Sequence, residues 1–205
     1  MKRVGILGGT FDPIHLGHLL LAEEARTHLA LEMVLFVPTG QPWLRRHRPI
    51  SPSHHRVAMA RLAVADNPAF AVSTLEVDRP GPTYTVDTLD VLHRQYGEGA
   101  EFYFLLGSDA LQDLPRWKEP ARLLTMCRLV VFPRPGAPPV DLSLLDRFQE
   151  GASQRAVALS GPLIGISGSE IRRRAAQDLS IRYWVPRPVE EYILGHGLYR
   201  DRSPL

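Results

Sequence analysis

The chain has 205 residues, of which 44% are hydrophobic and 22% are charged, so it is long enough to bury a full core as one domain. Its formal net charge of +2 excludes a strongly basic composition of the kind that binds nucleic acid, and its single cysteine, Cys127, excludes an internal disulfide. The sequence contains no apolar run of about 20 residues, the length that a membrane-spanning helix needs. We therefore expect a cytoplasmic protein with no nucleic-acid partner and no membrane partner.

The first 51 residues predict a β–α–β unit followed by a loop. Residues 3–9 form a short apolar run that ends in glycine, residues 15–30 place apolar side chains at helical spacing, and residues 33–38 form a second apolar run. Two strands joined through a helix run parallel in one sheet, so we expect a parallel pair here. Residues 39–51 are rich in proline and basic side chains and predict a loop.

Strands and helices alternate along the rest of the chain, which favours an α/β fold with a doubly wound, mostly parallel sheet. Ligands of such sheets bind beyond the carboxyl ends of the strands, so the segments after Leu7, Pro38, Leu106 and Phe132 should ring one crevice. Further strands are expected at residues 69–77, 101–107, 128–134 and, weakly, 156–161. Helices are expected at residues 54–66, 85–97, 121–127, 165–178 and 187–197. The first of these helices should be capped by Ser51 or Ser53.

Glycines and histidines are concentrated at the first strand-to-helix turn. Gly8 and Gly9 lack a Cβ and let the backbone approach a ligand closely, while unpaired N–H groups at the start of the next helix suit phosphate. His15 and His18 are three residues apart, so they share one face of the first helical turn. The turn therefore predicts a phosphate site.

Other interpretations of this turn stay open on the residues alone. Two histidines that are simply satisfied in a tight turn would show the same spacing, and a metal pair with Asp12 as a third ligand is the next competitor. The sequence matches neither the lysine-containing phosphate loop nor the G-x-G-x-x-G dinucleotide turn. A dehydrogenase is therefore disfavoured.

Two separated motifs carry a resemblance to a known family. The stretch GGTFDPIHLGH, residues 8–18, resembles the HxGH signature of the nucleotidyltransferase superfamily, and its fuller form resembles bacterial nicotinate mononucleotide adenylyltransferases. The stretch SGSEIR, residues 167–172, is similar to that superfamily's SxTxIR signature, with Ser169 in place of threonine. The resemblance extends from Gly5 to about Tyr199.

This resemblance implies a fold and an activity. The fold would be Rossmann-like, with residues 1–205 as a single nucleotidyltransferase domain and residues from about 165 to 205 as a C-terminal helical part that carries the second motif. The reaction would transfer the AMP moiety of ATP to nicotinate mononucleotide, giving nicotinate adenine dinucleotide and pyrophosphate. Mg²⁺ would arrive with ATP and bridge its phosphates, with no metal ligands required from the protein.

The resemblance also implies roles on the ATP side. His15, His18 and Arg172 would be the catalytic residues, with His18 as the donor to the α-phosphate or bridging oxygen. Asp109 would accept from the ribose hydroxyls, although a helix N-cap is the alternative for that residue. The remaining ATP contacts would come from Gly8, Gly9, Thr10, Phe11, Gly107, Ser167 and Ser169.

On the acceptor side the resemblance implies five residues. Tyr84 and Thr85 would lie beside the nicotinate ring, with Thr85 binding its carboxylate, and Trp117 would stack on the ring. Arg45, with Arg46 close behind, would bind the acceptor's phosphate.

Three other functions are kept beside this one. The first is adenylyl transfer to nicotinamide mononucleotide or another phosphorylated acceptor. The second is a catalytically silent nucleotide sensor, and the third is a metal hydrolase that uses His15 and His18. A homo-oligomer is also left open.

Overall fold

A computed structural model of the protein describes residues 2–42, 50–136, 138–161 and 164–200. Arg45 and Arg46 lie outside these described residues, so the interpretation of both stays a prediction. None of the helices in the described ranges is both long enough and apolar enough to span a membrane.

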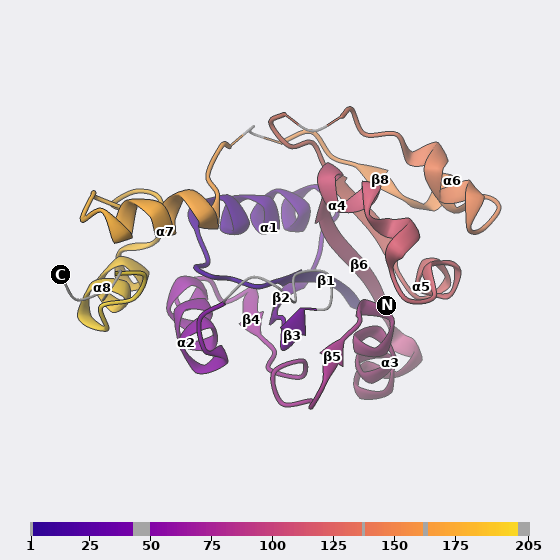
Figure 1. The fold of residues 1–205 in the computed structure, drawn as a ribbon. Coiled ribbons are helices and arrows are strands. Elements are labelled where there is room, and N and C mark those ends of the chain that lie inside the picture. Colours follow the sequence, from indigo (N-terminus) through magenta and orange to yellow (C-terminus); the bar gives the residue numbers. More distant parts are fainter. Residues whose placement is uncertain (1, 43–49, 137, 162–163, 201–205) are drawn as a thin grey trace.

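Six parallel strands form the central sheet (Figure 1). Their order in the sheet is β4-β2-β1-β6-β7-β8. The chain first adds β2 and β4 on one side of β1, and then adds β6, β7 and β8 on the other side. The neighbouring strands β1 and β6 are therefore the point where the winding reverses, which is where doubly wound sheets bind ligands. The strands are β1 (Lys2–Gly9), β2 (Met33–Pro38), β4 (Phe70–Val72), β6 (Ala100–Gly107), β7 (Arg128–Phe132) and β8 (Val157–Ala158).

Helices cover both faces of this sheet, and the α/β doubly wound prediction is confirmed. One buried core joins the sheet to α1 (Leu16–His28), α2 (Ser53–Val64), α7 (Gly168–Ala176) and α8 (Arg187–Gly195). The other core joins it to α3 (Thr85–Tyr96), α4 (Ser108–Gln112), α5 (Pro120–Met126) and α6 (Ala152–Arg155). Short 3-10 turns span Gly97–Gly99, Leu114–Arg116 and Leu142–Arg147.

The C-terminal helices lie on the same side of the molecule as the N-terminal ones. Figure 1 shows α7 and α8 beside α1 and α2, while α5 and α6 lie at the opposite end. Leu16 N–H, in the first turn of α1, donates to the Trp184 carbonyl oxygen at 3.0 Å, which ties the segment between α7 and α8 to the start of α1. The second motif is thereby brought close to the first.

The structure corrects three sequence-based expectations. The strand expected at residues 69–77 ends at Val72, because Thr74 and Asp78 close a turn through both a backbone bond and a 2.7 Å side-chain bond. Helix α2 is capped by Pro52, with no side-chain cap from Ser51 or Ser53. A two-stranded sheet of β3 (Gln41–Pro42) and β5 (Pro82–Thr83) forms where only loops were expected.

Candidate active site

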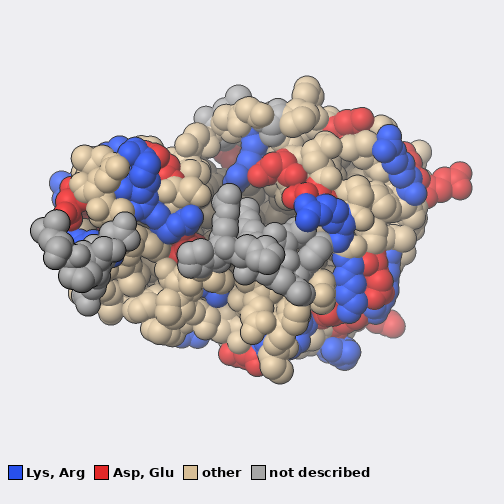
Figure 2. Space-filling view, in the orientation of Figure 1, with Lys and Arg blue, Asp and Glu red and all other residues tan. Residues whose placement is uncertain are grey.

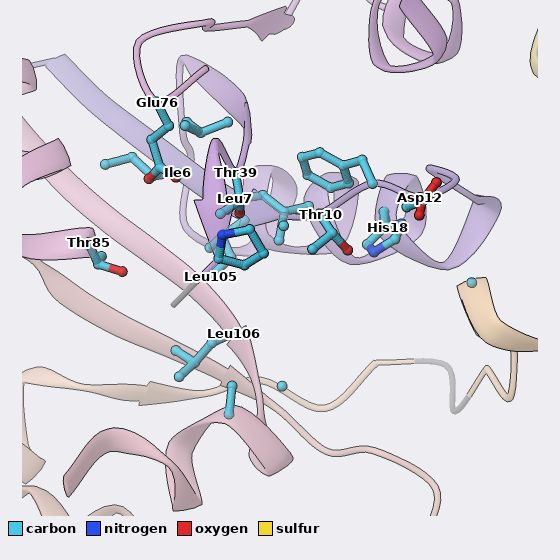
Figure 3. Close-up of a pocket in the computed structure, with 18 of the residues that line it drawn as sticks. Ile6, Leu7, Thr10, Asp12, His18, Thr39, Glu76, Thr85, Leu105 and Leu106 are labelled. Atoms are coloured by element: carbon cyan, nitrogen blue, oxygen red, sulfur yellow. The ribbon is translucent and has the colours of Figure 1, made fainter. Parts of the chain in front are cut away.

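A cavity of about 430 Å³ opens at the carboxyl ends of the central strands. It is lined by the segments that follow Leu7, Pro38, Leu106 and Phe132, as the sequence predicted. This volume is within the usual range of small-molecule sites. Figure 3 shows Glu76 and Thr85 toward one end, His18 and Asp12 toward the other, and Thr10 and Thr39 between them. We name the end with His18 the histidine end and the end with Thr85 the Thr85 end.

Every predicted site residue in the described part of the chain lines this one cavity. The two predicted acceptor arginines, Arg45 and Arg46, lie outside the described residues. The lining set contains Gly8, Gly9, Thr10, Phe11, His15, His18, Tyr84, Thr85, Gly107, Asp109, Trp117, Ser167, Ser169 and Arg172.

The two histidines form a stacked pair at the start of α1. Their ring centroids are 3.7 Å apart with an interplanar angle of 24°. The backbone N–H of His15 donates to Nδ1 of His18 at 3.2 Å, so the neutral His18 ring carries its proton on Nε2. The edge of Phe11 supports the His18 ring, with centroids 5.1 Å apart. This stacked geometry does not let both rings converge on one metal ion, so it speaks against the metal pair.

Both imidazoles are held in the neutral form. Removal from water lowers the pKa of His15 to about 4, with the positive charge of Arg134 as a second cause. Removal from water also lowers the pKa of His18 well below its usual value, with added contributions from His15 and Arg134. The pair can therefore offer N–H donors to a ligand without carrying a formal positive charge.

The start of α1 offers fewer free donors than the sequence suggested. Leu16 N–H is bonded to the Trp184 carbonyl oxygen, and His18 N–H donates to the His15 carbonyl oxygen at 2.9 Å. Because these two amides are already engaged, the start of the helix can offer a ligand its dipole and the imidazole N–H groups, but not these two backbone donors.

Arg172 reaches the histidine end from the C-terminal motif. Its Nη1 donates to the Asp12 carbonyl oxygen at 2.6 Å, and its Nη2 donates to the Ser169 hydroxyl at 3.3 Å. Ser167 caps α7 by accepting from the Glu170 N–H at 3.2 Å. These contacts hold one guanidinium at the cavity wall with further N–H donors left for an anion.

Asp109 and Arg134 form an ion pair at the edge of the cavity, with 3.4 Å between the nearest oxygen and nitrogen. The N-cap alternative for Asp109 is wrong, because Gly107 holds the N-cap position of α4. A Cβ on Gly107 would lie 2.5 Å from the Asp109 carboxylate and 3.0 Å from Arg134 Nε, so a side chain at this position would have to displace the ion pair. Arg134 was missed by sequence reasoning, which placed it at the end of an expected strand, whereas β7 ends at Phe132.

The Thr85 end combines the N-terminus of α3 with the aromatic ring of Trp117. Thr85 is the first residue of α3 and Tyr84 is its N-cap, so the positive end of the helix dipole faces the cavity. Trp117 packs edge-on against Phe104 with centroids 5.8 Å apart, and its Nε1 is buried without a hydrogen-bond partner among the described residues. Lys118 lies 5.1 Å from the centroid of the Tyr84 ring.

A buried acid that the sequence did not single out lies at the Thr85 end (Figure 3). Glu76 is 8% exposed and accepts a 2.7 Å hydrogen bond from the Thr88 hydroxyl. Burial raises the pKa of Glu76 above its usual range. A Cβ on Gly40 would collide with the Glu76 carbonyl oxygen, so only glycine lets these two segments pack together.

A buried arginine anchors two of the segments that line the cavity. Arg56 is 1% exposed, and its guanidinium donates to the carbonyl oxygens of Thr10 at 2.8 Å, Thr39 at 2.7 Å and Ser51 at 3.0 Å. It therefore joins the turn after β1 to the segment after β2. Sequence reasoning treated this residue only as part of a helix.

A smaller hollow adjoins the histidine end. It is lined by both histidines and by apolar residues of three segments, namely Leu20, Leu21, Phe132, Pro133, Ile164 and Ile166. Its volume is about 60 Å³. Glu24 and Arg134 also line it, so the hollow is a small slot of mixed character, largely apolar, directly beside the imidazole pair.

Charge on this side of the molecule is mixed. Figure 2 shows Lys and Arg side chains over α7, which contains three consecutive arginines beginning with Arg172, while acidic and basic groups alternate elsewhere on this face. Arg173 is paired with Glu170, its nearest nitrogen 2.6 Å from the carboxylate oxygen, so within this run Arg172 is the arginine that lines the cavity.

The fold and this site define a nucleotide-binding protein of the doubly wound α/β class, with neutral imidazoles and arginines gathered for phosphate. Comparison with known proteins makes the assignment specific. The chain belongs to the cytidylyltransferase-like family, whose model matches residues 6–174.

Curated relatives cover nearly the full chain. A protein of Roseiflexus sp. (strain RS-1) is 51% identical over 96% of this chain and 98% of its own length, and it carries the name "Probable nicotinate-nucleotide adenylyltransferase". Relatives with the same name from Thermomicrobium roseum and Thermus thermophilus are 52% and 48% identical over 98% and 97% of this chain, and over 92% and 100% of their own lengths.

A solved structure shares the fold. The nicotinic acid mononucleotide adenylyltransferase of Plasmodium falciparum, complexed with NaAD, superposes with a TM-score of 0.80. The alignment covers 97% of this chain and 98% of that one at 23% identity. This likeness confirms the Rossmann-like arrangement of the sheet and its helices.

Proposed function

We propose that this protein transfers the AMP moiety of ATP to nicotinate mononucleotide, giving nicotinate adenine dinucleotide and pyrophosphate. The observation that carries the proposal is that one cavity has the imidazole pair and Arg172 at its histidine end and Thr85, Tyr84 and Trp117 at its Thr85 end. The names of the curated relatives, at about half identity over nearly the whole chain, support the same reaction.

In this reaction an oxygen of the acceptor's phosphate attacks the α-phosphorus of ATP in line. The new P–O bond forms as the bond to the bridging oxygen breaks, and pyrophosphate leaves with the electron pair. No covalent intermediate with the protein is required, so catalysis rests on positioning and on donors aimed at the growing charge.

The histidine end supplies those donors. His18 presents Nε2–H to the α-phosphate or bridging oxygen, and His15 lies against it as a second donor. Arg172 and Arg134 add positive charge for the β and γ phosphates, with Ser167 and Ser169 beside them. The adjacent apolar hollow accepts the adenine, and Asp109 faces the ribose hydroxyls.

The Thr85 end selects the acceptor. The first turn of α3 offers N–H donors and a positive dipole end to the ring carboxylate, while Trp117 provides an aromatic face for the pyridine ring. Tyr84 adds a second aromatic group, and Arg45 or Arg46 would bind the acceptor's phosphate.

Mg²⁺ would arrive as part of the substrate with ATP, where it would offset phosphate charge and take mostly phosphate and water ligands. Within the described ranges, no group of three or more His, Cys, Asp or Glu side chains could hold a metal ion. The protein's own part is to bind the phosphates through N–H donors and to hold their oxygens in place.

A second acceptor is favoured by one observation. Glu76 is a buried carboxyl at the Thr85 end, and in its charged form it would disfavour an anionic ring substituent. The amide, nicotinamide mononucleotide, is therefore the competing acceptor. Burial raises the pKa of Glu76, and this direction lessens the repulsion that an anionic ring substituent would meet.

The test is steady-state kinetics of the full chain with ATP and Mg²⁺, using each mononucleotide in turn. We expect equal amounts of pyrophosphate and dinucleotide, with a higher kcat/KM for the acid. ATP binding without pyrophosphate release would instead indicate a silent sensor. Activity removed by chelators and restored by zinc without Mg²⁺ would indicate a metal hydrolase.

Three broader expectations belong to the same proposal. Residues 1–205 form one nucleotidyltransferase domain, with residues from about 165 onward as its C-terminal helical part. The location is the cytoplasm, where a lone thiol such as Cys127 stays reduced. The partners are the two nucleotides, and a homo-oligomer stays a prediction that sedimentation can test.

A further inference from the structure

Asp12 is a buried junction of three segments that are far apart in the sequence. It is 4% exposed, and its Oδ1 accepts from the Tyr199 hydroxyl at 2.7 Å. Its Oδ2 accepts from the Ser51 N–H at 3.1 Å, and its carbonyl oxygen accepts from Arg172 at 2.6 Å. One residue therefore connects the end of the chain, the segment that enters α2, and the arginine of α7.

The position of Asp12 bears directly on the imidazoles. It lies between Phe11, whose edge supports the His18 ring, and the N-cap His15. Phe11 and Ile14 are 1% and 0% exposed, so this turn is packed on both sides of Asp12. Figure 3 shows Asp12 and His18 at the same end of the cavity. A shift of Asp12 would therefore move both the histidine turn and the Arg172 anchor.

Tyr199 reaches this junction from outside the matched family region, which ends at residue 174. Its hydroxyl also lies 3.9 Å from the Met59 sulfur in α2. Burial and the neighbouring Asp12 carboxylate raise the pKa of Tyr199, so the group stays an O–H donor. A carboxylate oxygen in a site this buried needs such a donor, because an unsatisfied charged acceptor is costly.

We propose that Tyr199 is a positioning residue for adenylyl transfer, acting through Asp12 on the histidine turn and on Arg172. The proposal rests on the proposed function. Loss of the hydroxyl removes one donor from the buried carboxylate, which then shifts toward other donors. Because the imidazoles and Arg172 act most strongly on the transition state, the effect falls on kcat and leaves ground-state binding nearly unchanged.

The first test compares Tyr199→Phe with a matched control, Tyr192→Phe. The Tyr192 hydroxyl makes a 2.9 Å bond to His55 on α2, so the control also removes a hydroxyl that ties the C-terminal segment to the body of the protein. We expect Tyr199→Phe to lower kcat by roughly tenfold, with both KM values within about twofold of wild type. Tyr192→Phe should leave kcat within about twofold of wild type.

The second test is a double-mutant cycle with Asp12→Asn. If Tyr199 acts through Asp12, the double variant should lose no more than about twofold beyond the worse single variant. The melting temperature of every variant is measured as well. The rate assays are run at a temperature well below the lowest of these melting temperatures. Folded Asp12→Asn alone must also lower kcat more than it raises KM.

The outcomes separate this proposal from the proposed function. A wild-type protein that forms no dinucleotide refutes the proposed function and the positioning role with it. An active wild type with an unchanged kcat for Tyr199→Phe refutes only the positioning role. Independent, multiplicative effects of the two substitutions, or equal losses for both tyrosine variants, also overturn it.

Discussion

The two ends of the cavity differ in the groups that they would present to a negatively charged ligand. The histidine end uses directed N–H donors on rings that are neutral in the free protein, with Arg134 and Arg172 nearby. The Thr85 end uses a helix terminus and aromatic faces, and it contains a buried acid, Glu76. From this difference we infer a division of roles, in which the first end responds to charge that develops during a reaction and the second end selects a ligand.

The two ends differ in whether their charge can change when a ligand binds. Because nearby anions raise a histidine pKa, a triphosphate bound at the histidine end would favour protonation of the imidazole pair. A helix terminus and a tryptophan face are fixed features that contribute equally before and during reaction. Substitutions at the histidine end should therefore lower kcat, and those at the Thr85 end should raise the acceptor KM.

His18→Ala should give the largest effect. Removing a donor aimed at the reacting phosphate should lower kcat by about 10²–10³-fold while ATP affinity changes little. Stopped assays of pyrophosphate release and calorimetric ATP titration measure the two quantities. His28→Ala, at the exposed end of the same helix, is the matched control. A kcat close to that of wild type would remove His18 from the reaction.

The pH dependence of stability should reveal the neutral pair. The folded-state pKa of His15 is about 4 against an ordinary 6.5, so the unfolded chain binds more protons between these values. The contribution of His15 to the free energy of unfolding is therefore fully present above pH 6.5, and it is lost as the pH falls toward 4. Relative to His15→Gln, wild type should lose on the order of 2 kcal/mol of unfolding free energy between about pH 8 and about pH 5. Parallel urea-melt profiles would contradict the assignment.

Trp117→Ala sharpens the acceptor side of the comparison. Loss of the aromatic face should raise KM for the mononucleotide by roughly tenfold and leave KM for ATP and kcat nearly unchanged. Trp184→Ala, outside the cavity, controls for general loss of an aromatic side chain, and both are read by initial-rate kinetics with each substrate varied. An equal rise in both KM values would contradict the interpretation that Trp117 stacks on the pyridine ring of the acceptor.

Lys118→Ala should give the smallest change. Its amine lies 2.8 Å from the Asp87 carboxylate and above the Tyr84 ring, but its side chain is 39% exposed, so solvent screens both interactions. We expect the acceptor KM to rise by no more than about threefold, with kcat unaltered. Arg116→Ala, a neighbouring exposed pair with Asp113, serves as the control. A large loss of kcat would mean that the Thr85 end takes part in the chemical step.

Much of this arrangement was readable from local pattern. Apolar runs of roughly four to eight residues located the central strands of the sheet, and the rule for parallel sheets placed the segments after Leu7, Pro38, Leu106 and Phe132 around one crevice. His15 and His18 follow the first strand, whose end was predictable, whereas Arg172 was assigned to the crevice only through the resemblance of the second motif.

The residues that were missed depend on distant contacts. Arg56 is satisfied by carbonyl oxygens of Thr10 and Thr39, which are 46 and 17 residues away, so nothing in its own helix marks it as buried. Glu76 fell inside an expected strand, and only the turn closed by Thr74 and Asp78 directs it to the cavity. The strands β3 and β5 are shorter than any periodic signal.

The most direct measurement of the central claim is a crystal structure of the protein with nicotinate adenine dinucleotide bound. The account predicts the adenylyl phosphate within hydrogen-bond distance of His18 Nε2, the adenine in the hollow beside the imidazoles, and the pyridine ring between Thr85 and Trp117. A dinucleotide bound in the reverse direction, or with both phosphates out of reach of the histidine pair, would contradict it.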